Sequence, residues 1–148
     1  MSKQPRPPLS PFARIVHWGM VAALVLTLIA ARRWLGAHAV LGMITVLTLV
    51  VWVAWLALFR RQYPPASPIA RYLLPAIVVV FALIPVLGLI AYGGKYASGP
   101  LSGLLNGWTG LGQAAAVVHG PLVLLLLALL LLHTIVAAIS KLRQRRAA

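Results

Sequence analysis

Four long apolar stretches alternate with short polar segments along the chain. The apolar stretches cover about residues 11–33, 36–59, 68–92 and 113–140. Because about 20 apolar residues in a helix cross the hydrocarbon core of a bilayer, each stretch is long enough to span it once. The pattern predicts an all-α integral membrane protein, a four-helix bundle with an antiparallel, up-down-up-down order.

Short polar segments define where these helices begin and turn. Residues 32–36 join the first two spans, and so short a connection forces them into an antiparallel hairpin. Two Ser-Pro pairs, Ser10-Pro11 and Ser67-Pro68, precede the first and third spans. Serine can accept an N-cap hydrogen bond and proline fits the first helical position. The phrases SPFAR and SPIAR therefore predict equivalent helix starts on one side of the membrane.

The remaining segments complete the predicted organisation. We expect residues 1–9 to form a mobile tail, residues 10–141 to form a single transmembrane domain, and residues 142–148 to form a basic tail. Residues 93–113 hold seven of the chain's 12 glycines and predict the one long loop. The third span contains Pro75 and Pro85, and the second of these is deep enough to kink a helix.

The composition agrees with a membrane setting and excludes several kinds of chemistry. Of 148 residues, 62% are hydrophobic and only 9% are charged, whereas a soluble domain carries about 25% charged residues. The absence of Cys excludes disulfides, thiolate metal sites and iron–sulfur clusters. The absence of Asp and Glu removes the usual carboxylates of acid–base catalysis and of hard-cation sites.

All 13 cationic side chains lie in the tails or near the ends of the apolar stretches. We therefore interpret the net charge of +13 as a topology signal and expect no nucleic-acid partner. Ten of these residues lie on the side of both termini, and Arg32, Arg33 and Lys95 lie on the other. This bias predicts cytoplasmic termini in a multi-pass membrane protein that is surrounded by lipid.

Four histidines lie within or at the edge of the apolar stretches. A buried imidazole without any carboxylate in the chain needs another partner, and in a helical bundle a metal or haem iron is the obvious one. His119 and His133 fall within about 40° of one helix face and about 21 Å apart. His17 matches the depth of His133, and His38 matches that of His119. This predicts an inner haem on His17 and His133 and an outer haem on His38 and His119.

Other residues near these levels could support a cofactor. Gly19, Gly42 and Gly120 adjoin the histidines and leave space for a flat macrocycle, although small residues also serve ordinary helix packing. Arg14 and Arg71 are first of all topology determinants, and they could also neutralise haem propionates. Zinc is a poor rival, because only two imidazoles share each level and no acid or thiolate completes a tetrahedral set.

Several short motifs together resemble one known family. They are R-x-x-H-W at residues 14–18, a His at the start of the second span, R-x-Y-P-P-x-x-P at residues 61–68, P-V-x-G-L-I at residues 85–90 and H-x13-H at residues 119–133. In order and spacing they look like the bacterial cytochrome b-561 family of di-haem, quinone-linked membrane proteins, over nearly the whole chain. The resemblance implies that His17, His38, His119 and His133 bind two haem b groups (iron protoporphyrin IX) non-covalently.

The expected function is electron transfer across the membrane, because an iron with two imidazole ligands has no open position. The resemblance adds ubiquinone as a partner and superoxide oxidation at the outer face as an activity, and no catalytic residue is assigned. A structural or designed membrane bundle without redox activity is the alternative. The lack of every acid, including the acid that family members often carry where this chain has Gly120, is as compatible with an engineered version as with a natural member.

Overall fold

The computed structural model describes residues 10–31, 33–59 and 68–146. Across these residues it contains four α-helices and no strand: α1 (Pro11–Ala30), α2 (Leu35–Phe59), α3 (Pro68–Gly94) and α4 (Thr109–Arg146). Each helix is long and apolar enough to cross a membrane. The predicted all-α, multi-pass membrane character is therefore confirmed.

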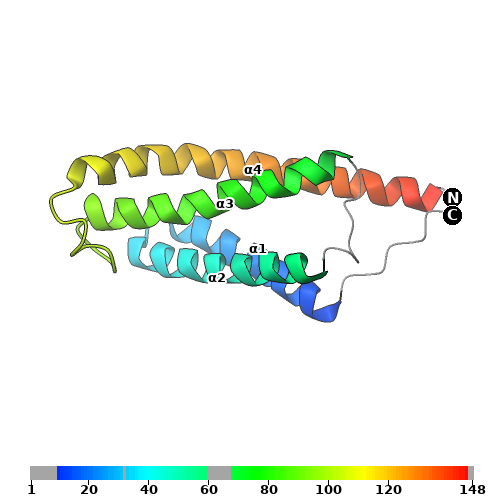
Figure 1. Ribbon diagram of the computed structural model, residues 1–148, viewed down its shortest axis with the longest axis horizontal. Coiled ribbons are helices and arrows are strands. Elements are labelled where there is room, and N and C mark those ends of the chain that lie inside the picture. Colours follow the sequence, from blue (N-terminus) through cyan, green and yellow to red (C-terminus); the bar gives the residue numbers. More distant parts are fainter. Residues whose placement is uncertain (1–9, 32, 60–67, 147–148) are drawn as a thin grey trace. The chain divides into compact units, whose positions relative to one another are not determined.

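The helices form two compact units, which are coloured blue to green and green to red in Figure 1. The first hairpin, α1 with α2, lies within residues 1–64, and the second hairpin, α3 with α4, lies within residues 65–148. The single domain over residues 10–141 stays a prediction.

The start of α1 follows from its first residues. The Ala13 N–H donates to the Ser10 Oγ at 3.2 Å, and Pro11 occupies the first helical turn, where a missing N–H costs nothing. The helix start predicted at Ser10-Pro11 is confirmed. Its counterpart Ser67 lies outside the described residues, and α3 begins at Pro68.

The first hairpin is antiparallel and closed by a tight turn. Early residues of α1 contact late residues of α2: His17 lies against Trp52, whereas Thr27 lies against Thr45. The helix α1 ends at Ala30 rather than near residue 33, because the N–H groups of Arg33 and Trp34 donate to the Ala30 carbonyl as a turn. Arg32, predicted to lie in this connection, is outside the described residues.

Small side chains dominate the buried face of α1. Ala13, Met20, Ala23, Thr27 and Ala30 recur every three, four or seven residues and are all buried. Alanine and threonine allow two helix backbones to approach closely, which is the usual basis of helix pairing in lipid. The face that α1 presents to α2 is therefore set by this stripe.

Two glycines allow α3 and α4 to come into contact at the loop end of the second hairpin. A Cβ at Gly94 would lie 3.0 Å from the Gly112 Cα, and a Cβ at Gly112 would meet the backbone nitrogen of Lys95. The end of α3 and the start of α4 thus touch backbone to backbone. The helix α3 continues to Gly94, and α4 begins at Thr109. The connecting loop is therefore residues 95–108, which is shorter than the predicted loop of residues 93–113.

Inside this loop, one glycine is required by both its conformation and its neighbour. Gly99 has φ +82°, and a Cβ there would collide with the Tyr92 ring. The Ser98 N–H donates to the Tyr92 carbonyl at 3.1 Å and holds the chain against the end of α3. The loop is thereby folded back onto its own hairpin.

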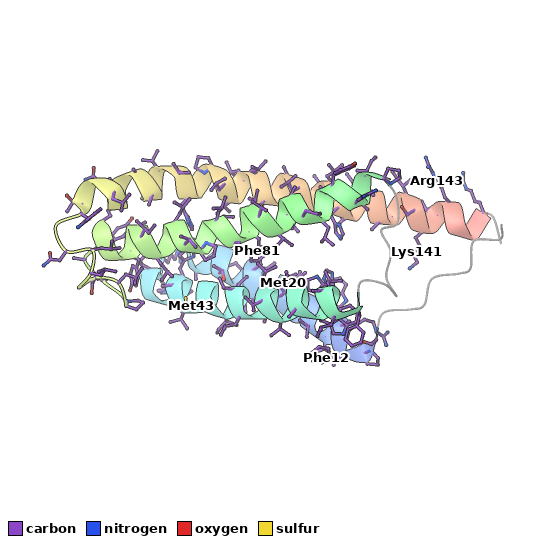
Figure 2. The ribbon with its side chains drawn as sticks, viewed as in Figure 1. Phe12, Met20, Met43, Phe81, Lys141 and Arg143 are labelled. Carbon is purple, nitrogen blue, oxygen red and sulfur yellow. The ribbon has the colours of Figure 1, made fainter. Side chains whose placement is uncertain are left out.

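The last helix is longer than its apolar part. It continues through residues 142–146, which the charge pattern predicted to be a tail, because Lys and Arg are good helix formers and favour a helix C-terminus. At 38 residues α4 is about 57 Å long, against roughly 30 Å for a hydrocarbon core. Figure 2 shows Lys141 and Arg143 pointing to opposite sides of this basic end. The predicted tail 1–9, the polar turn 60–67 and residues 147–148 lie outside the described residues.

Candidate functional site

His38 lies near the start of α2 and is bonded to the facing helix. Its Nδ1 is 2.9 Å from the carbonyl oxygen of Thr27 on α1. Because a carbonyl oxygen can only accept, Nδ1 carries the proton and donates it. In the neutral ring, Nε2 then carries the lone pair, which is the form in which imidazole binds a metal.

His119 on α4 repeats this arrangement in the second hairpin. Its Nδ1 donates to the carbonyl oxygen of Ile84 on α3 at 2.9 Å. The ring also lies against Gly88, where a Cβ would be 3.1 Å from the His119 Cε1 and 3.4 Å from Nδ1. The absence of a side chain at Gly88 is therefore part of what seats the His119 ring.

His17 lies in an aromatic cluster in the first hairpin. Its ring centroid is 5.3 Å from that of Trp52 on α2 and 5.7 Å from that of Trp18. Trp52 in turn stacks on Trp55 at 5.4 Å, and Trp55 lies 5.4 Å from Phe59. The sequence alone leaves two alternatives for Trp18, Trp52 and Trp55, which are packing on a porphyrin and facing lipid. The structure places Trp52 and Trp18 in contact with His17.

His133 lies 14 residues beyond His119 on α4 and is partly buried. The first hairpin thus holds His17 and His38, and the second holds His119 and His133. Each predicted haem would take one ligand from each hairpin. Both pairings therefore join residues of two separately described units, and they stay predictions.

Two kinds of metal site make different demands on the protein. Among residues 10–31, 33–59 and 68–146, no three His, Cys, Asp or Glu side chains gather as they would around a metal ion. A zinc site would need three or four protein ligands, and the preference for haem over zinc stays a prediction. Haem iron takes four nitrogens from the porphyrin and needs only two from the protein.

The glycines predicted to make space for a macrocycle lie in open surroundings. Apart from the chain neighbours and the adjacent helix backbone, no atom of the residues that the structure describes lies within 4 Å of the Cβ position at Gly19 or Gly120. At Gly42 the nearest such atom is the Thr27 Cγ2 at 3.9 Å. The role of these three residues beside a cofactor stays a prediction.

The cationic residues singled out from the sequence are exposed. Arg14 and Arg71 lie in the first turns of α1 and α3. Lys95 follows α3 and places its Nζ 5.1 Å from the centroid of the Tyr96 ring. Arg33 lies in the turn after α1, and Arg32 is outside the described residues. The role of Arg14 and Arg71 toward haem propionates stays a prediction.

Two buried threonines behind His38 were missed by sequence reasoning. The Thr27 Oγ1 and Thr45 Oγ1 are 3.2 Å apart and join α1 to α2. Each hydroxyl oxygen also lies close to a carbonyl oxygen of its own helix, Thr27 Oγ1 at 2.7 Å from Ala23 and Thr45 Oγ1 at 2.8 Å from Leu41. Because each hydroxyl has a single proton, one of the two donates to its own helix while the other donates across the interface. The sequence signal that could have found them is a hydroxyl side chain inside an apolar stretch, because such a hydroxyl needs a hydrogen-bond partner there.

No protein-family model, curated protein or solved structure matches this chain. The resemblance to the cytochrome b-561 family therefore rests on the sequence motifs alone.

Proposed function

We propose that this chain transfers electrons across a membrane through two b-type haems, as a relative of the bacterial cytochrome b-561 family. His38 and His119 would hold the outer haem, and His17 and His133 the inner haem. The observation that carries the proposal is the pair of Nδ1–carbonyl bonds, 2.9 Å each, at His38 and His119.

These two bonds match what haem ligation demands of a histidine. A metal-binding imidazole almost always donates its other ring N–H to a carbonyl or carboxylate, which fixes the tautomer and makes the ligating nitrogen more basic. The chain has no Asp or Glu side chain, so a backbone carbonyl is the acceptor most readily offered within a helix pair. Both outer histidines use one, from the facing helix of their own hairpin.

The inner site draws support from the surroundings of His17. Trp52 lies against the imidazole, and Trp55 and Phe59 extend the aromatic surface along α2. Such walls exclude water and suit a flat, apolar macrocycle. Arg14 and Arg71, in the first turns of α1 and α3, are the candidate charges for inner propionates. A bis-imidazole haem, when bound, supplies a one-electron ferric–ferrous couple.

The proposed setting is a bacterial plasma membrane with both termini in the cytoplasm and the four helices in an up-down-up-down order. The excess of Lys and Arg on the side of the termini supports this orientation. Quinone is the proposed electron partner, through the family resemblance.

Cofactor number and pairing can be tested in detergent-purified protein. We expect two haems per chain by haem quantification and a sharp reduced α-band in the visible spectrum. Replacing any one of the four histidines with Ala should leave one haem per chain. Thr134→Ala is the matched control, because Thr134 adjoins His133 and its hydroxyl donates only to the Leu131 carbonyl of its own helix.

Double variants separate the pairing from the mere presence of haem. His38→Ala with His119→Ala should retain the inner haem, whereas His38→Ala with His17→Ala should lose both haems. Loss of both haems from the first double variant would show that the pairing is wrong. A wild-type protein that stays colourless with added haem would favour the structural or designed bundle without redox activity.

A further inference from the structure

One face of α1 carries an open hollow of about 470 Å³ lined by Pro11, Arg14, Ile15 and Trp18. These residues recur at intervals of three, one and three, which places them on a single face of the helix. Ile15 is 71% exposed and Trp18 is 66% exposed, so α2 does not cover the apolar walls.

This face points away from the partner helix. At 100° per residue, its centre lies about 160° around α1 from the direction of Ala13 and Met20, which are buried. The face is also distinct from the one on which His17 meets Trp52. In a membrane helix, a face turned away from its partner and rich in exposed apolar surface suits lipid.

The side chains that line the hollow change from charged to apolar along the helix. Arg14 lies in the first turn, and Trp18 lies about 6 Å deeper. A phospholipid has the same order, because its phosphate lies outermost and its glycerol and acyl chains lie deeper. Tryptophan is enriched at this interfacial depth.

The charge at Arg14 has no acidic side chain to pair with within the chain. A guanidinium is always protonated, and the chain contains neither Asp nor Glu. An anion from outside the polypeptide is therefore a natural counter-ion. A phosphate can bond a guanidinium through two parallel N–H···O contacts, which makes it a well-matched partner.

We propose that this hollow binds an anionic phospholipid, with the phosphate on Arg14 and the start of an acyl chain along Ile15 and Trp18. A net negative headgroup fits better than a zwitterionic one, because the +13 charge of the chain repels the ammonium of a choline. The proposal does not depend on haem binding.

The third helix provides a matched control. Arg71 occupies the same position in SPIAR as Arg14 does in SPFAR, and both arginines are exposed. Four residues further along, α1 has Trp18 whereas α3 has Pro75. Removing either arginine thus removes the same charge from a first helical turn, but only Arg14 belongs to the hollow.

The test measures phosphatidylglycerol adducts on the full-length purified chain by native mass spectrometry, with phosphatidylcholine as reference lipid. We expect R14Q to lower the apparent affinity for phosphatidylglycerol about tenfold more than R71Q does, because both variants lose the general attraction of one charge but only R14Q also loses the charge-assisted hydrogen bond to the phosphate. W18A should also weaken this binding, and R14K should retain part of it. Circular dichroism serves as the folding readout, and haem content is measured separately because Arg14 and Arg71 are also candidates for the propionates.

Equal losses in R14Q and R71Q would overturn the proposal, because they would show only general attraction to the basic end of the protein. Equal affinity for the two lipids in the wild type would exclude a charge-selective site. A third contrary result is unchanged lipid binding in R14Q together with loss of haem, which would assign Arg14 to a propionate instead.

Discussion

The first hairpin (α1 and α2) and the second hairpin (α3 and α4) each bond one histidine to a backbone carbonyl of the facing helix, but they bring their helices together differently. In the first, two hydroxyls meet across the interface, Thr27 with Thr45 at 3.2 Å. In the second, missing side chains allow contact: Gly88 makes room for the His119 ring, and Gly94 touches Gly112.

This difference has a physical consequence for how each hairpin tolerates change. A hydroxyl pair in lipid adds a modest directional bond, which can be lost without steric conflict. A backbone-to-backbone contact tolerates no added atom, because neither partner has a flexible end that can move away. The second hairpin should therefore be the more sensitive to single substitutions.

Gly112→Ala should produce the largest effect on stability. The new Cβ would meet the backbone of Lys95 and of Gly94 and push the end of α3 away from α4. We expect a loss of about 1–3 kcal/mol in the free energy of unfolding. Unfolding by SDS in mixed micelles, followed by circular dichroism, measures it.

Gly110→Ala is the control for that experiment. Gly110 lies two residues earlier in α4, and nothing stands near the position of its Cβ. Alanine there should be neutral or stabilising by up to about 1 kcal/mol, because it forms helix more readily than glycine. Equal destabilisation by the two changes would mean that close contact with α3 is not the reason glycine is needed.

These glycines also show where sequence reasoning reached its limit. The helix start at Ser10-Pro11 was predictable, because capping depends only on neighbouring residues. Gly94, Gly110 and Gly112 were interpreted as loop, since glycine usually interrupts helices. At Gly94 and Gly112 the glycine instead permits contact with another helix, and that depends on how the helices are rotated. No local pattern contains this information.

The candidate site, like the fold, was predictable from the sequence only in part. The histidines and their depths were visible in the apolar pattern. The carbonyls of Thr27 and Ile84 that bond His38 and His119 were not, because every residue carries a carbonyl and only packing selects one. Similarly, the basic residues 142–146 end the apolar stretch, but charge does not end a helix, and α4 continues through them.

Gly88→Ala should specifically weaken haem binding by His119. Its Cβ would stand 3.1 Å from the His119 Cε1, so the ring must shift and strain its bond to the Ile84 carbonyl. Loss of such an outer-shell bond lowers metal affinity about 10–100-fold. On the proposed function, haem titration of the apoprotein should show one weakened site and one unchanged site.

Gly110→Ala, in the same hairpin, adds the same methyl group where no atom of the described residues lies within 4 Å of the Cβ position. Haem affinity should be unchanged. If Gly88→Ala and Gly110→Ala behaved alike, then the close contact at Gly88 would have no special part in seating His119. NMR detection of the imidazole Nδ1 proton provides a readout that does not depend on haem.

The smallest expected effect concerns the hydroxyl pair of the first hairpin. Thr27→Val and Thr45→Val keep the shape of each side chain and remove the bond between the helices. A double-mutant cycle of unfolding free energies should give a coupling of about 0.6 kcal/mol, typical of interhelical hydrogen bonds in lipid. The cycle of Thr27→Val with Thr48→Val should give none, because the Thr48 hydroxyl donates to the Thr45 carbonyl of its own helix. A Thr27–Thr45 coupling no larger than this reference would mean that the alanine-rich stripe alone holds α1 to α2, and that the two hairpins differ less than their contacts indicate.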